Sequence, residues 1–105
     1  MSFNGKILLV DDEAHVRKYL GLIVRQLGAP TVIEASNGRE AVELYLTERP
    51  DLVLLDVNMP VQDGLQTLKE MSQVDPDCVV VMMTSLAGRQ IIEQAVALGA
   101  ANYIR

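Results

Sequence analysis

The chain has 105 residues, of which 50% are hydrophobic, and a formal net charge of -5 at pH 7. This length predicts one domain over residues 1–105, with enough apolar side chains for a sizeable core. The acidic balance and scattered Lys and Arg residues argue against binding to nucleic acid or to an anionic membrane surface. The apolar runs are far shorter than the roughly 20 residues of a membrane helix, and the N-terminus lacks the apolar segment of a signal peptide. We therefore expect a cytoplasmic protein.

Short apolar runs alternate with segments of helical periodicity from the N-terminus onward. The sequence predicts a strand over Lys6–Val10 and a helix over Ala14–Leu27, whose apolar residues recur at helical spacing. A second strand is predicted over Thr31–Ala35. The segment Asn37–Glu40 resembles a capping box, which indicates the start of a helix that ends before Pro50.

The second half of the chain repeats this alternation. Leu52–Leu55 is a continuous Leu and Val run, which is typical of a strand covered on both faces. Helices are predicted over Leu65–Gln73 and Ala87–Leu98, and strands over Val79–Met83 and Ala101–Ile104. Strands that alternate with helices predict a doubly wound α/β domain with a parallel sheet and right-handed crossovers.

Side chains with oxygen atoms follow three of the predicted strands. Asp11 and Asp12 follow the first strand, Asp56 the third and Thr84 the fourth. In an open parallel sheet, ligands bind outside the carboxyl ends of the strands, so these side chains are candidates for one shared site. Neighbouring carboxylates repel one another, and a hard cation such as Mg²⁺ relieves this repulsion. Each residue alone has a simpler reading, in which Asp12 caps a helix and the others merely end strands, but the combination favours a magnesium and phosphate site.

The segments ILLVDDE, LVLLDVNMPVQDG, MMTS and GAANYI, in this order and spacing, resemble the receiver domain of two-component response regulators. The resemblance covers the whole chain. It implies a five-stranded parallel sheet with the flavodoxin-like strand order 2-1-3-4-5.

The resemblance also implies a role for each carboxylate. Asp56 becomes the phosphoacceptor, whose carboxylate attacks the phosphohistidine of a sensor histidine kinase or a phosphotransfer protein. Asp11, Asp12, Asp56 and the backbone carbonyl of Asn58 become the ligands of Mg²⁺. The ion then neutralises charge on the phosphoryl group during an in-line transfer.

Two further residues match the switching residues of the family. Thr84 corresponds to the hydroxyl that donates to a phosphoryl oxygen, and Tyr103 to the switch aromatic on the fifth strand. Their movement changes the surface of the fourth helix and fifth strand, through which a downstream protein is bound. The resemblance thus predicts a signalling module that catalyses only its own phosphorylation and dephosphorylation, rather than a metabolic enzyme. A strand tyrosine without a switching role is the simpler reading of Tyr103.

The chain departs from the family pattern at its end. The family has a lysine one residue beyond Arg105, which pairs with the acceptor, and then a fifth helix; this sequence stops first. In the family the first and fifth helices cover the same face of the sheet. If the chain truly ends at Arg105, we therefore expect an uncovered apolar face, with two copies associating through it or exchanging elements; the alternative is a longer chain that continues beyond Arg105. Sedimentation measures this state, and a stable monomer at micromolar concentration contradicts it.

Two functions from other classes are alternatives. Magnesium-dependent phosphohydrolases of the haloacid-dehalogenase type also use an Asp nucleophile, but their second Asp, in a D-x-D motif, is replaced here by Asn58. Turnover of a small phosphate ester distinguishes them from a receiver. A flavodoxin-like nucleotide-binding module requires a glycine-rich segment after the first strand, where this chain has Asp-Asp-Glu.

Overall fold

The computed structural model describes residues 4–28, 30–56, 64–83, 93–94 and 97. Within these residues, four strands form one parallel sheet of order β2-β1-β3-β4. The strands are β1 (Lys6–Val10), β2 (Thr31–Ala35), β3 (Leu52–Asp56) and β4 (Val80–Met83). This confirms the first four positions of the expected strand order. Of the predicted helix over 87–98, the structure describes only residues 93–94 and 97, and the predicted strand over 101–104 lies outside the described residues.

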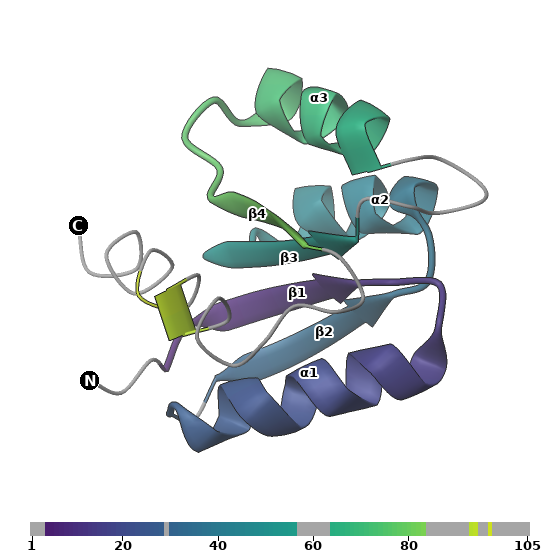
Figure 1. The fold of residues 1–105 in the computed structure, drawn as a ribbon. Helices are drawn as coiled ribbons and strands as arrows, with labels where there is room; N and C mark the ends of the chain where they lie inside the picture. The colour runs from purple at the N-terminus through teal and green to yellow at the C-terminus, as the bar shows by residue number, and fades with distance from the viewer. Residues whose placement is uncertain (1–3, 29, 57–63, 84–92, 95–96, 98–105) are drawn as a thin grey trace.

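Within the described part of the chain, helices α1, α2 and α3 pack on the two faces of this sheet (Figure 1). Helix α1 (Ala14–Gln26) lies on one face, and α2 (Gly38–Glu48) and α3 (Gly64–Val74) lie together on the other. The first three predicted helices are therefore present, with ends that differ from the prediction by one or two residues. Within the part of the chain that the structure describes, no helix is long and apolar enough to cross a membrane.

Both faces of the central strands are buried, which explains their uninterrupted apolar sequence. Successive side chains of a strand point to opposite faces. Ile7 and Leu9 of β1 pack with the α1 residues Leu20 and Val24, whereas Leu8 packs on the other side. The second cluster joins β1 and β3 to residues of α2 and α3, including Ala41, Tyr45 and Met71. The two hydrophobic layers fix the sheet between α1 and the α2–α3 pair. The predicted association through an uncovered face stays a prediction.

A capping box opens α2, as the sequence predicts, with one difference in its partners. The Asn37 side chain accepts a hydrogen bond from the Glu40 N–H at 2.9 Å. The Glu40 carboxylate returns to the N–H of Ser36 at 3.1 Å, one residue before the cap itself. The last residue of the helix is Glu48, and its C-cap, Arg49, has a left-handed conformation with φ 48° and stands directly before Pro50. Proline lacks the N–H that a further helical bond requires.

Tyr45 connects α2 to the turn that follows α3. Its side chain is only 2% exposed, and its hydroxyl donates to Asp75 Oδ2 at 2.8 Å. The other oxygen of Asp75 accepts from the N–H of Asp77 at 3.0 Å, which holds the carboxylate in place. Burial raises the pKa of Tyr45 above its ordinary value, and the bond to the Asp75 carboxylate raises it further. The neutral phenol is therefore the form that the fold stabilises.

Replacing Tyr45 with Phe tests this link. We expect the free energy of unfolding at pH 7 to fall by about 1.5 kcal/mol, because a buried hydrogen bond to a charged acceptor is lost. In the wild type, the neutral Tyr45 phenol contributes its full stabilisation of the fold below the ordinary tyrosine pKa of about 10. This stabilisation is lost as pH rises toward the higher pKa of Tyr45 in the folded state. Urea unfolding between about pH 9 and pH 11 should thus show a steeper loss of stability in the wild type than in Tyr45→Phe. Tyr19→Phe, at a half-exposed position on α1, is the matched control. Parallel pH profiles for Tyr45→Phe and the wild type would contradict this account.

Candidate metal centre

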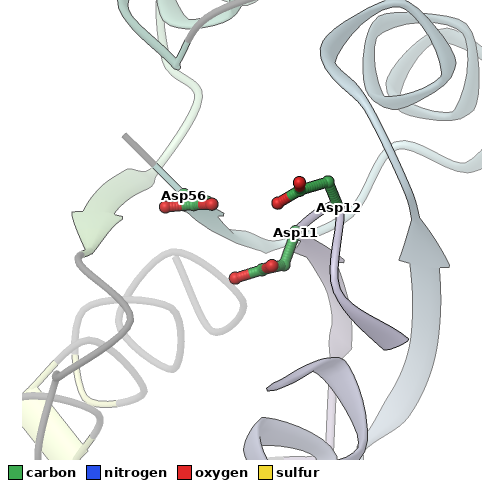
Figure 2. A group of neighbouring side chains, drawn as sticks. All are labelled: Asp11, Asp12 and Asp56. Carbon is green, nitrogen blue, oxygen red and sulfur yellow. The ribbon is translucent and has the colours of Figure 1, made fainter. Parts of the chain in front are cut away.

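Three carboxylates meet at the carboxyl edge of the sheet (Figure 2). β1 and β3 are paired in parallel, and Val10 lies opposite Leu55. The residues that follow each of these, Asp11 and Asp56, are consequently neighbours across the two strands. Together with Asp12, each carboxylate offers one oxygen atom, and these oxygens lie within 4.8 Å of one another. The fold thus brings together the three acidic residues that the sequence singled out.

The electrostatics of this group fit a hard cation. Asp11 is 4% exposed, Asp56 is half-buried and Asp12 is exposed. Burial raises the pKa of Asp11, and the charges of Asp56 and Asp12 add to this rise, while a hydrogen bond from the Glu13 N–H opposes it. Ionised carboxylates at this spacing therefore destabilise the fold unless positive charge is placed among them. Oxygen donors of this kind fit Mg²⁺, which Asp11, Asp12 and Asp56 would hold.

Asp11 is anchored by its backbone as well as by its side chain. Its N–H donates to the carbonyl of Ala35 on β2 at 3.1 Å, and its carbonyl accepts from Arg17 Nη1 at 2.7 Å. Its Oδ1 accepts from the N–H of Glu13 at 2.9 Å. Holding one carboxylate oxygen fixes the direction of the other. Asp11 is therefore a rigid part of this site rather than a loosely held surface acid.

The simpler reading of Asp12 as a helix cap is wrong. The N-cap of α1 is Glu13, whose own side chain makes no capping hydrogen bond. Asp12 stays exposed beside the other two carboxylates. The remaining predicted site residues, Asn58, Thr84 and Tyr103, lie outside the described residues, so their roles stay predictions.

Arg17 is a site residue that the sequence reasoning missed. Its side chain is only 17% exposed and bonds the backbone of Asp11. The sequence does indicate that Arg17 is partly buried. It precedes Leu20 by three residues and Val24 by seven, which places it on the buried stripe of α1. A charged residue at such a position requires a partner.

The profile of the response regulator receiver domain matches residues 7–105 of this chain. The chain belongs to the response regulator receiver domain family. Receivers of this family are modules of two-component signalling, and this assignment sets aside the phosphohydrolase and nucleotide-binding alternatives.

Curated relatives of this receiver domain include chemotaxis and sporulation proteins. Chemotaxis protein CheY of Thermotoga maritima is 34% identical over 99 residues, which cover 94% of this chain and 82% of the relative. Sporulation initiation phosphotransferase F of Bacillus subtilis is 38% identical over 100 residues, or 95% of this chain and 80% of the relative.

Solved structures show the same fold. A receiver domain protein from Clostridium thermocellum superposes with a TM-score of 0.84 at 19% identity, covering 93% of this chain and 95% of the other. The CheX–CheY–BeF3–Mg²⁺ complex of Borrelia burgdorferi gives a TM-score of 0.73 at 30% identity, covering 90% of this chain and 72% of the other. The second structure is of a relative crystallised with magnesium.

Proposed function

We propose that residues 1–105 form a receiver domain that accepts a phosphoryl group on Asp56 from the phosphohistidine of a sensor histidine kinase or a phosphotransfer protein. Mg²⁺ would be held by Asp11, Asp12, Asp56 and the backbone carbonyl of Asn58. One observation carries this proposal: this chain belongs to the receiver domain family, and one oxygen from each of its three carboxylates lies within 4.8 Å of the others at the ends of β1 and β3.

Phosphoryl transfer to Asp56 requires little from the protein beyond positioning the reacting groups. An oxygen of Asp56 attacks the phosphorus, a new O–P bond forms, and the P–N bond breaks with its electron pair passing to the imidazole nitrogen. A carboxylate is ionised at neutral pH, so no general base is needed. Asp56 ends a central strand and is half-buried, which holds it in place while leaving it open to the donor. When bound, magnesium neutralises negative charge that gathers on the phosphoryl oxygens.

The output of the domain is a changed protein-binding surface. We propose that Thr84 donates to a phosphoryl oxygen, and that Tyr103 turns inward and alters the face of the fourth helix and fifth strand toward a downstream protein. The family assignment supports this part of the proposal. The relative from Borrelia burgdorferi was crystallised with a protein partner, CheX, and Mg²⁺, which supports a switch that acts through protein contacts.

Phosphorylation by a small phosphodonor tests the proposal without knowledge of the cognate kinase. The purified chain is incubated with acetyl phosphate and magnesium chloride, and its intact mass is recorded. We expect the mass of one phosphoryl group to be added, and we expect EDTA to suppress this addition. An unchanged mass at saturating donor and magnesium would contradict the proposed function.

A further inference from the structure

We propose that Arg17 is a positioning residue that holds Asp11 and Asp12 in the geometry that binds magnesium. This inference rests on the proposed function of the carboxylate site. It concerns a residue that lies on α1, outside the group of carboxylates themselves.

The guanidinium of Arg17 joins three elements. Its Nη1 donates to the carbonyl of Asp11 at 2.7 Å, directly after β1. Its Nε donates to Glu34 Oε1 on β2 at 2.9 Å. The Arg17 side chain is 17% exposed, whereas that of Glu34 is 50% exposed, so the Arg17 side chain is the more shielded from solvent of the two. Shielding strengthens both bonds relative to those of a fully exposed ion pair.

The bond to the Asp11 carbonyl controls two ligands rather than one. This carbonyl and the N–H of Asp12 belong to one planar peptide group. Fixing the carbonyl therefore fixes the plane from which the Asp12 backbone continues. The N–H of Asp11 is bonded to Ala35 on β2, and Arg17 adds a second link from Asp11 to the same strand through Glu34. Two links therefore hold the turn that carries both acids to β2.

The charge of Arg17 acts in the opposite direction to its hydrogen bonds. A cation beside the site repels a second cation, so charge alone predicts that removal of Arg17 strengthens magnesium binding. Positioning predicts that the same removal weakens it. Groups that orient metal ligands typically contribute about 10- to 100-fold to metal affinity. The sign of the change in affinity therefore separates the two effects.

Three variants distinguish the positioning effect of Arg17 from the effect of its charge: Arg17→Met, Arg17→Lys and the control Lys18→Met. Lys18 is the adjacent residue of α1 and is exposed, so Lys18→Met removes the same charge without touching the turn. Lysine keeps the charge of Arg17 but lacks the planar fork that reaches two partners. Magnesium is titrated into each folded 105-residue chain, and the dissociation constant is measured by calorimetry and by the rise in melting temperature.

We expect Arg17→Met to weaken magnesium binding about 10-fold and Arg17→Lys about 3-fold. Lys18→Met should bind magnesium as tightly as the wild type or slightly more tightly. An affinity of Arg17→Met equal to or greater than that of Lys18→Met would overturn the inference. If Arg17→Met does not fold, Arg17→Lys decides, because a wild-type affinity in that variant overturns the inference and a weakened one supports it. A wild-type chain that binds no magnesium would instead overturn the proposed function itself, and the inference with it.

Discussion

Asp56→Asn should reduce phosphoryl incorporation from acetyl phosphate to background. The substitution keeps the size of the side chain but replaces the nucleophilic carboxylate with an amide, so no acyl phosphate can form. Intact mass after incubation with magnesium and the donor measures the effect. Because Asp56 is one of three carboxylates within 4.8 Å of one another, the loss of its charge should also stabilise the metal-free fold.

The matched control for this experiment is Asp77→Asn. Asp77 is exposed in the turn after α3, away from the carboxyl edge of the sheet, and its replacement makes the same chemical change. We expect the control to be phosphorylated as fully as the wild type. A mass gain on Asp56→Asn equal to that on the control would show that another residue accepts the phosphoryl group.

The double variant Asp11→Asn, Asp12→Asn should lose magnesium binding and gain stability in the absence of metal. At ten times its dissociation constant, magnesium stabilises the wild type by about 1.4 kcal/mol, and this gain should vanish in the variant. Without metal, we expect the free energy of unfolding to rise by about 1–2 kcal/mol, because charges about 5 Å apart near a protein surface repel by that order and Asp12 is partly screened by solvent. The Asp11→Asn change leaves an amide oxygen in place of Oδ1, and this oxygen can still accept from the Glu13 N–H.

Urea unfolding with and without magnesium measures both effects in one experiment. The Asp77→Asn variant again serves as the control, and its response to magnesium should match that of the wild type. Equal stabilisation of the double variant and the wild type by magnesium would place the ion elsewhere. A double variant that is less stable than the wild type without metal would contradict mutual repulsion as the main cost of this cluster.

Much of the fold could be predicted because buried parallel strands leave a plain local signal. The apolar runs of β1 and β2 give the observed bounds, and the boundaries of the other elements shift by one or two residues. The meeting of Asp11 with Asp56 followed from the rule that parallel strands end at one edge, together with the strand order that the family resemblance implied. Local pattern alone does not establish that β1 and β3 are neighbours, because a helix, a strand and a second helix lie between them in the sequence.

The contacts that escaped prediction join residues far apart in the sequence. Tyr45 and Asp75 are 30 positions apart, and Arg17 and Glu34 are 17 apart. Each of these two hydrogen bonds depends on how two elements of the fold pack together. In neither bond do the partners belong to a recognisable sequence motif. The sequence could show that Arg17 lies on a buried stripe, but not that the Asp11 carbonyl and Glu34 would both receive its donors. The position of the three carboxylates was therefore more predictable than the network that orients them.

The most direct test of the account is to locate the phosphoryl group on the chain. Sodium borohydride reduces an acyl phosphate to an alcohol, which converts a phosphorylated aspartate to homoserine. The wild type is phosphorylated with acetyl phosphate and magnesium, reduced, digested and mapped by peptide mass spectrometry. We expect homoserine at the position of Asp56 and unmodified side chains at Asp11 and Asp12. Homoserine at any other aspartate, with Asp56 intact, would contradict this expectation.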